Sequence, residues 1–590
     1  MPLLNVIHVT HEAVYKVGGI GTVLEGLINS RPYRDQVGRT VLVCPLFYPE
    51  KPSRLGAGAI VEYSPLDQIY GSPYADAFRR IESDWNVRLV YGRKPIEDVP
   101  SARRSMCEVL LVDLRGIHSG PLNYVKGQLW ERYGLSSNRY EHIWEFEQYV
   151  QLAGPAAAAL RAMRLSSAGE PAAVLAHEFM GVPTALTLTM QEPRAWRSLF
   201  HAHEVAPVRR IVEAAPGHDV MFYRAMELAR ANGLYLEQVF GPQHDYFKHA
   251  VVEAASFCDR TLAVGHLVAR ELEFFGRKFD SAQVALAFNG VPAGKITVEE
   301  KHTSREHLQN YAESLLGWRP DYTFTHVTRF VRSKALWRDL DVLAALDPLL
   351  GQRGQSAVLL VLSTELPRRS PEDIRRMEEE YDWPLAHREG LPDLTAGETD
   401  FFRQVEVFNT RARNVKVIFI NQWGFSRDTC GLRVPPEVEF QDFRRGSDAE
   451  FGLSLYEPFG ISPLEPLTFG SVCVVSTSCG CAGFLARVVG EKPVANVLLA
   501  DYLHNGLAIE SVQEAIRIDA PARRKLEREL APKIAEGLLA RLPTSDEQRG
   551  KLIRSGYELA KKMSWDAVAE RFVFPALREA CAQRRVLSMA

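Results

Sequence analysis

Short apolar runs recur along nearly the whole chain, and segments with a helical pattern separate them. Many of these runs are continuous stretches of Val, Ile and Leu, as expected for strands that are covered on both faces. The first series consists of residues 5–9, 40–44, 88–91, 109–114, 174–176, 199–201, 261–264 and 284–288, and the second of residues 323–327, 357–362, 415–420, 451–455, 472–476 and 497–500. Strands that alternate with helices indicate βαβ units and parallel sheets. Two such series predict an α/β protein with two doubly wound, Rossmann-like domains.

The domain boundary is predicted from a turn between the two series. At 590 residues the chain is too long for a single hydrophobic core. Residues 288–292 read FNGVP, a Gly/Pro turn, and the polar segment 295–303 follows it. We therefore predict a first domain over residues 1–292 and a second over residues 293–563. Residues 564–590 have an amphipathic helical pattern, which predicts a C-terminal helix that packs back on the first domain.

The composition excludes several classes of partner. A net charge of −3 provides no basic surface of the kind that binds nucleic acid. No apolar run approaches the roughly 20 residues that span a bilayer, and the first residues lack the basic start of a signal peptide. Eight cysteines in a chain of this length are not a disulfide framework. We expect a cytoplasmic protein that binds neither nucleic acid nor membrane, and the sequence leaves its association into a homo-oligomer open.

Residues 453–465, LSLYEPFGISPLE, form the most informative segment. An apolar run ends at Glu457, a turn with Gly460 follows, and Ser462 opens an amphipathic run that contains Glu465. This pattern predicts a strand that leads into a helix N-terminus, whose unpaired N–H groups and positive dipole end suit a phosphate. The alternative is a capping box, with Ser462 as N-cap and Glu465 three residues later, which needs no ligand. That alternative leaves Glu457 unexplained.

A lysine–glycine loop follows the first predicted strand. Lys16 precedes Gly18 and Gly19, and glycines permit a close approach of the backbone to a phosphate or sugar. A tight turn with a surface lysine is the alternative. The pattern is not G-x-G-x-x-G and no acid ends the next strand, so a dinucleotide is disfavoured and no cofactor is expected.

Two basic residues follow the first strand of the second series. Arg329 and Lys334 lie between that strand and the next helical pattern, where they are placed to clamp a diphosphate. Solvated surface charge is the alternative. The location favours the first interpretation, because the end of this strand shares a sheet edge with Glu457.

Histidines end two predicted strands of the first series. His177 ends one strand, and His201 and His203 share a face of the next, an arrangement that can chelate a metal ion. No third ligand with familiar spacing accompanies the pair, so we predict no metal site. Histidines that line a sugar pocket, or that the backbone satisfies, are the favoured interpretation.

Two other groups that resemble ligand motifs are interpreted as structural. Asp339 and Asp341 form a D-x-D pair inside a helical pattern, where residues two apart point in different directions. We predict that both aspartates face solvent and that no metal is required. Cys473, Cys479 and Cys481 lack the C-x-x-C spacing of metal and redox sites, and we predict buried thiols.

Together these motifs resemble those of the glycogen and starch synthases, retaining glycosyltransferases of the GT-B fold. In chain order the matching motifs are the loop from Lys16 to Gly19, the His177 segment HEFMGVP, the Asn289 turn NGV, Arg329 with Lys334, and Glu457 with Glu465. The glutamate pair is shared by many retaining GT-B transferases, and the lysine–glycine loop narrows the match to glucan synthases. The resemblance covers nearly the whole chain and implies two Rossmann-like domains that face each other across a deep cleft.

The resemblance implies which residues bind the phosphates of a nucleotide-sugar. Arg329 and Lys334 would bind the diphosphate and stabilise the departing nucleotide. Gly460, Ile461 and Ser462 would present N–H groups or a hydroxyl to the distal phosphate. Fixed cations and amides stabilise the charge that develops on the leaving group without reorganising.

The resemblance also implies which residues bind the sugars. Glu457 would hold the glucose hydroxyls and stabilise the developing oxocarbenium charge, and Glu465 would contact the ribose. His177 would lie near the reacting sugar, and Lys16 would reach the phosphate or sugar from the opposite domain. The Asn289 turn and the glycines beside Lys16 count among the substrate-binding residues. No separate nucleophilic carboxylate is identifiable, so we expect front-face retention.

The implied activity is transfer of glucose from ADP-glucose or UDP-glucose to the non-reducing end of an α-1,4-glucan. Residues 125–130 and 133–136 look like the animal and fungal enzymes, which use UDP-glucose. Residues 457–460 and 564–566 look like the bacterial and plant enzymes, which use ADP-glucose. The arginine helix that senses glucose 6-phosphate in animal enzymes has no clear match.

Two alternatives to a glucan synthase remain open at this point. One is a related GT-B transferase with a small acceptor, in sucrose, trehalose-type or maltose-1-phosphate synthesis. The other is a catalytically silent protein that binds glucan or nucleotide, which the presence of Lys16, Arg329, Lys334 and Glu457 disfavours.

Overall fold

The computed structural model divides the chain into two units, each with its own sheet. It describes residues 3–16, 18–167, 169–214, 218–279, 283–490, 494–504 and 509–582. Unit 1 consists of Met1–Arg210, Gly233–Gly290 and Trp565–Ala590, and unit 2 of Ile211–Asn232 and Val291–Ser564. The sequence-based boundaries placed residues 211–232 in the first domain, whereas the structure packs them within unit 2.

Within the described residues, unit 1 contains a ten-stranded sheet in the order β10-β9-β8-β7-β1-β2-β6-β5-β3-β4. The strands are β1 (Leu4–Val9), β2 (Val37–Pro45), β3 (Ile60–Ser64), β4 (Ile69–Tyr70), β5 (Arg88–Asp98), β6 (Arg103–Asp113), β7 (Ala172–His177), β8 (Trp196–Ala202), β9 (Arg260–Ala263) and β10 (Val284–Leu286). Strands β10 to β6 pair in parallel, and β5, β3 and β4 join the edge in antiparallel fashion. Because β1 pairs with both β2 and β7, the chain reverses its direction across the sheet between β1 and β7.

The helices of unit 1 pack on this sheet and on one another. They are α1 (Gly19–Asn29), α2 (Arg31–Gln36), α3 (Ala75–Trp85), α4 (Ser119–Tyr133), α5 (Trp144–Ala162), α6 (Glu178–Gln191), α9 (Leu236–Phe240), α10 (Phe247–Ala255), α11 (His266–Phe275), α22 (Trp565–Val568) and α23 (Phe574–Ala582); α7 (Ala206–Ala214) crosses the division at Arg210. Trp565 packs so closely on Gly26 of α1 that a Cβ there would lie 2.0 Å from the indole nitrogen. The C-terminal helices are therefore an integral part of unit 1.

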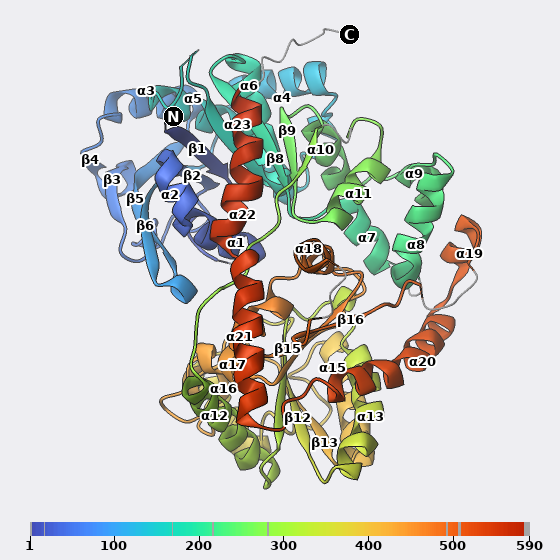
Figure 1. Ribbon diagram of the computed structural model, residues 1–590. Coiled ribbons are helices and arrows are strands. Elements are labelled where there is room, and N and C mark those ends of the chain that lie inside the picture. The colour runs from blue at the N-terminus through green and yellow to red at the C-terminus, as the bar shows by residue number, and fades with distance from the viewer. Residues whose placement is uncertain are drawn as a thin grey trace. The chain divides into compact units, whose positions relative to one another are not determined.

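Unit 2 contains a parallel sheet of six described strands in the order β13-β12-β11-β14-β15-β16. They are β11 (Tyr322–Val327), β12 (Ala357–Leu362), β13 (Val415–Ile420), β14 (Ala449–Gly452), β15 (Val472–Ser476) and β16 (Val497–Ala500). The helices are α8 (His218–Ala231), α12 (Val298–Leu316), α13 (Trp337–Gln352), α14 (Pro371–Tyr381), α15 (Ala396–Arg411), α16 (Arg427–Cys430), α17 (Phe440–Gly446), α18 (Gly480–Val489), α19 (Val512–Arg517), α20 (Ala520–Leu539) and α21 (Asp546–Lys562). Figure 1 shows α12 and α17 along one side of this sheet and α13 and α20 along the other.

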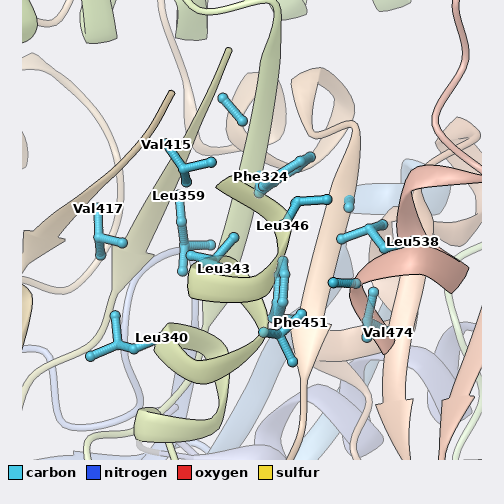
Figure 2. Close-up of a cluster of buried hydrophobic side chains, with 14 of the residues drawn as sticks. Phe324, Leu340, Leu343, Leu346, Leu359, Val415, Val417, Phe451, Val474 and Leu538 are labelled. Carbon is cyan, nitrogen blue, oxygen red and sulfur yellow. The ribbon is translucent and has the colours of Figure 1, made fainter. Parts of the chain in front are cut away.

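The core of unit 2 explains why its strands are continuously apolar. Along β12, Leu359 points into the cluster that contains α13 and α20, and Leu360 points into the cluster that contains α12 and α14. Figure 2 shows Leu343 of α13 beside Leu359, and Leu538 of α20 in the same cluster. Each fully buried leucine of this kind contributes roughly 2–3 kcal/mol. A strand that helices cover on both faces has no solvent-exposed face, so its sequence does not alternate between polar and apolar residues.

The strand pattern predicted from the sequence is confirmed, with one displacement and one omission. Each of the fourteen predicted runs overlaps an observed strand. The prediction missed β4 at the sheet edge and β3 beside it, which are short strands that are only partly buried. The run 451–455 extends beyond the end of β14 at Gly452, where the carbonyls of Leu453 and Ser454 accept hydrogen bonds from the buried Arg338 guanidinium.

The prediction that Asp339 faces solvent was wrong. Its side chain is fully buried, and its carboxylate lies 2.6 Å from Nδ1 of His326. Asp341 is half-buried and pairs with Arg524 at 2.8 Å. Both aspartates sit on the side of α13 that neighbouring elements cover. The three cysteines at 473, 479 and 481 are buried thiols, as predicted. No helix in the described part of the chain is long and apolar enough to cross a membrane.

Candidate functional site

The strand order of unit 2 places two loops at one point of the sheet edge. Numbered from the first strand of the unit, the order is 3-2-1-4-5-6, which reverses between β11 and β14. In sheets of this kind ligands bind outside the carboxyl ends of the strands at such a reversal. The loop after β11 carries Arg329 and Lys334, and the loop after β14 carries Glu457. Topology therefore brings together two motifs that lie 123 residues apart in sequence, since 457 − 334 = 123.

A buried ion pair joins these two loops. The Lys334 ammonium contacts the Glu457 carboxylate, with side chains that are 9% and 16% exposed. The carbonyl of Ser333 accepts hydrogen bonds from the N–H groups of Leu455 and Tyr456, at 2.8 and 3.3 Å. The backbone bonds fix the spacing of the loops, so the ion pair is held in place by the main chain as well as by charge. Arg329 lies in the same loop as Lys334 and is exposed.

The turn after Glu457 is packed tightly on the start of α18. Gly460 has φ +85°, which few residues other than glycine adopt. The carbonyls of Glu457 and Phe459 accept hydrogen bonds from Gly480 and Cys481, at 2.8 and 2.7 Å. A Cβ on Gly480 would lie 1.8 Å from the carbonyl oxygen of Pro458. The position of the turn is therefore set by the absence of a side chain at residue 480.

Gly480→Ala is expected to lower the activity of this site by about 10²-fold, because the turn must move by more than about 1 Å to admit the methyl group. Turnover and the circular dichroism spectrum of the variant check the prediction. Gly127→Ala is the matched control: Gly127 lies inside α4, where an added methyl group would meet no atom within 4 Å, so stability should stay level or rise by about 1 kcal/mol. Full activity in Gly480→Ala would show that this turn is not part of the functional site.

The segment that follows the turn differs from the predicted helix N-terminus. Ser462–Phe469 is a 3₁₀ helix whose N-cap is Ile461, with Pro466 inside it. The Ser462 hydroxyl donates to the carbonyl of Val327 at 2.6 Å, across to the end of β11. The capping-box interpretation of Ser462 and Glu465 was therefore wrong, because the serine lies inside the helix and its hydroxyl is engaged elsewhere. The first N–H groups of the helical turn lack partners within it.

A buried arginine that the sequence did not reveal holds this segment. Arg444 of α17 donates to the carbonyl of Ser462 and lies 3.1 Å from the Glu465 carboxylate and 3.0 Å from that of Glu450. Arg444 and Glu450 are almost completely buried. Burial raises the pKa of Glu450, although Arg444 opposes this shift, and the two carboxylates hold the pKa of Arg444 above its ordinary value against the effect of burial. Glu465 remains 25% exposed, so one face of its carboxylate is open to a ligand.

The lysine–glycine loop of unit 1 is fastened by an acid. One carboxylate oxygen of Glu12 accepts hydrogen bonds from the N–H groups of Gly18 and Gly21, each at 2.9 Å. This carboxylate satisfies two of the N–H groups at the N-terminus of α1, which begins at Gly19. Lys16 is half-exposed, and its ammonium lies 2.7 Å from Glu25.

Histidines from three strands converge in unit 1. His177, at the end of β7, is fully buried, with Nε2 2.9 Å from Nδ1 of His8 and Nδ1 2.9 Å from Nε2 of His203. His201 lies opposite His177 in the β7–β8 register, and neither of its ring nitrogens makes a hydrogen bond. Burial lowers the pKa of His8 to about 3 and that of His201 to about 4, and it lowers the pKa of His177 and His203 as well. The four imidazoles are therefore neutral at pH 7.

The Asn289 turn is buried against the C-terminal segment of unit 1. Asn289 is 7% exposed, and its amide oxygen is buried without a hydrogen-bond partner. A Cβ on Gly290 would lie 2.5 Å from the indole of Trp565. The glycine thus permits close packing of this turn on Trp565.

The geometry defines an α/β protein with two Rossmann-like units, as the sequence predicted. Comparison with known proteins shows a likeness of architecture only. No protein-family model matches the sequence, and no curated protein does. Similar solved structures include the catalytic domain of starch synthase IV from Arabidopsis thaliana with ADP and acarbose, at 13% identity over 98% of this chain and 100% of that chain, with a TM-score of 0.49. Sucrose-phosphate synthase from Thermosynechococcus elongatus has 15% identity over 98% of both chains, with a TM-score of 0.48. An α,α-trehalose-phosphate synthase (UDP-forming) from Burkholderia vietnamiensis has 11% identity over 98% of both chains, with a TM-score of 0.48. At these values the likeness carries no argument about activity.

Proposed function

We propose that this protein is a cytoplasmic glycosyltransferase that transfers glucose, with retention, from a nucleotide-glucose to the non-reducing end of an α-1,4-glucan. The observation that carries the proposal is the contact between Lys334 and Glu457 at the reversal of strand order in unit 2. A cation and an acid at that point match the two charges of the reaction, a diphosphate that gains negative charge and a sugar that gains positive charge.

Lys334 supports the phosphate side of the reaction. Its ammonium is almost fully buried, and a charge–charge interaction is stronger there than at an exposed site. We propose that the diphosphate takes the place of Glu457 as its partner when donor binds. The amides of Gly460, Ile461 and Ser462 face the same phosphate in this proposal, and Arg329 adds a second cation from the same loop as Lys334. Fixed groups of this kind need no reorganisation as the leaving group departs.

The two glutamates support the sugar side. Once the phosphate engages Lys334, Glu457 is free to bind the glucose hydroxyls and to stabilise positive charge at the anomeric carbon. Glu465 is held by Arg444 on one side and is partly exposed on the other, which suits hydrogen bonds to ribose hydroxyls. The ion pair with Arg444 keeps this carboxylate charged and oriented.

In unit 1 we propose substrate contacts for Lys16, Gly18, Gly19, His177 and Asn289. Lys16 is accessible, because half of its side chain is exposed. The ring of His177 is oriented by its contacts with His8 and His203, and the buried amide oxygen of Asn289 has no hydrogen-bond partner, so it can accept one from a sugar hydroxyl. The free state of all eight thiols fits the reducing cytoplasm.

An assay with purified protein, ADP-glucose or UDP-glucose, and either glycogen or a sugar phosphate tests the proposal. Glucan-dependent nucleotide release with growth of the polymer is the expected result. Release that requires glucose 6-phosphate or fructose 6-phosphate would replace the glucan by a small acceptor, the alternative activity. Binding of the nucleotide-glucose without release, for either donor and every acceptor, would refute glycosyl transfer.

Transfer is expected to require no added Mg²⁺ or Mn²⁺. The reason is that Lys334 and the amides after Gly460 supply the positive charge that a divalent ion provides in other sugar transferases. Initial rates with and without chelator, followed by add-back of Mg²⁺ or Mn²⁺, measure the effect. A rate that collapses with chelator and recovers with Mg²⁺ would contradict the assigned role of Lys334.

A further inference from the structure

Three histidines at the ends of β7 and β8 in unit 1 lie close together. Nitrogen atoms from His177, His201 and His203, one from each ring, all lie within 4.8 Å of one another. The sequence-based expectation of no metal site rested on the lack of a third ligand near His201 and His203. Parallel pairing of β7 with β8 supplies that ligand, because it sets His177 beside His201.

We propose that His177, His201 and His203 form a binding site for a divalent transition metal ion of the class that prefers imidazole, with Zn²⁺ as the reference ion. Neutral imidazole nitrogens are common ligands of Zn²⁺ at about 2.0–2.1 Å. Three such ligands in a tetrahedron lie about 3.3 Å apart. The observed separation of 2.9 Å between His177 and His203 is close to this value.

His201 is the observation that distinguishes this cluster from ordinary packing. Its side chain is 2% exposed, yet neither Nδ1 nor Nε2 has a hydrogen-bond partner. A buried polar atom without a partner costs about 1–3 kcal/mol. Coordination of a metal removes that cost. Rotation of the ring toward His203, whose centroid lies 4.2 Å away, breaks no hydrogen bond.

The hydrogen bonds behind His177 are consistent with a ligand role. With Nδ1 on the metal, the Nε2–H of His177 donates to Nδ1 of His8, at 2.9 Å. The Nε2–H of His8 then donates to the Tyr33 hydroxyl at 3.0 Å, which donates to Thr40 at 3.1 Å. One set of tautomers satisfies the whole chain. Such outer hydrogen bonds orient metal-bound histidines.

One of the three ligands is partly exposed to solvent. His203 lies just past the end of β8 and is partly exposed, whereas His177 and His201 are buried. An ion bound by three imidazoles keeps one tetrahedral position for water. This proposal does not rest on glycosyl transfer, because its readout is metal binding.

The test uses the full chain without a histidine tag, stripped with chelator and titrated with Co²⁺ and then Zn²⁺. We expect one Co²⁺ per chain, with the visible absorption of a four-coordinate ion, and displacement of it by Zn²⁺. His203→Gln and His201→Gln are expected to weaken binding by at least about 100-fold. Since His203 is partly exposed, its variant should fold even if that of His201 does not.

The matched control is His244→Gln. His244 belongs to the other described cluster with metal-ligand geometry, formed with Glu237 and His249, where one Glu237 oxygen already accepts a hydrogen bond from the N–H of Gln243. This variant should bind as the unmodified chain does. The proposal is overturned if the unmodified chain binds no stoichiometric metal ion, or if His203→Gln, with unchanged circular dichroism, binds as tightly as before.

Discussion

Glu457→Gln is expected to lower glucosyl transfer by about 10²–10³-fold while the chain still folds. Glutamine keeps the size and the hydrogen-bonding capacity of the side chain but removes the charge that Lys334 contacts. Lys334→Met should cause a loss of similar size, because it removes the cation that stabilises the leaving diphosphate. Initial rates with saturating donor and glucan, together with thermal unfolding, measure the two effects separately.

The double variant and a surface control sharpen this test. If Lys334 and Glu457 act on the same transition state, the combined loss should be smaller than the product of the two single losses. Glu547→Gln breaks an exposed ion pair with Lys551 elsewhere in unit 2 and should leave the rate unchanged. Normal turnover in Glu457→Gln would show that the reaction centre lies elsewhere.

Arg444→Met is expected to destabilise unit 2 by about 3–5 kcal/mol, the usual cost of removing one partner of a buried ion pair. Glu450 is completely buried, and without Arg444 it keeps hydrogen bonds from Thr325 and from the N–H of Val327 but loses its paired guanidinium. The unfolding midpoint of the variant, compared with the unmodified chain, gives the magnitude. Activity should fall too, because Ser462 and Glu465 lose their common anchor.

The pH dependence of the stability of Arg444→Met tests whether the unpaired Glu450 carboxylate causes the loss of stability. Burial already raises the pKa of Glu450, and loss of the guanidinium raises it further. The cost of the buried charge is present in full above the raised folded-state pKa of Glu450; it declines as the pH falls below that pKa, and it is gone below the ordinary pKa of a glutamate in the unfolded chain. The stability deficit of Arg444→Met should therefore shrink as the pH falls toward the ordinary pKa of glutamate.

Two further variants separate charge from packing in this test. Adding Glu450→Gln to Arg444→Met should restore part of the lost stability, because it removes the stranded carboxylate. Arg445→Met, at the next and only half-buried position of α17, should cost much less. Equal losses in both arginine variants would contradict the argument.

The sequence predicted the fold because the cause of the fold is local and repeated. A strand covered on both faces must be apolar at every position, and β12 satisfies this rule at each of its residues. β4 at the sheet edge and β3 beside it escaped prediction because they are short and only partly buried, so burial imposes little pattern on them. The buried Asp339 escaped for the opposite reason: helical periodicity does not show that His326 lies across from it.

Part of the candidate site was also predictable. Lys334, Glu457 and Gly460 stand next to strand ends, and strand ends of a parallel sheet meet at one edge. Arg444 and Glu450 were not predictable as parts of the site. In the sequence, an arginine looks like a surface charge until its buried partners are known.

By itself, the sequence determined two α/β units and the loops that carry a cation, an acid and a glycine turn. Only the tertiary structure decided that Lys334 contacts Glu457, that Arg444 binds Ser462 and Glu465, and that His177 joins His201 and His203. The reason is physical. Hydrophobic periodicity reports the neighbours that every strand or helix must have, whereas contacts between polar side chains depend on strand order and register, which no local pattern encodes.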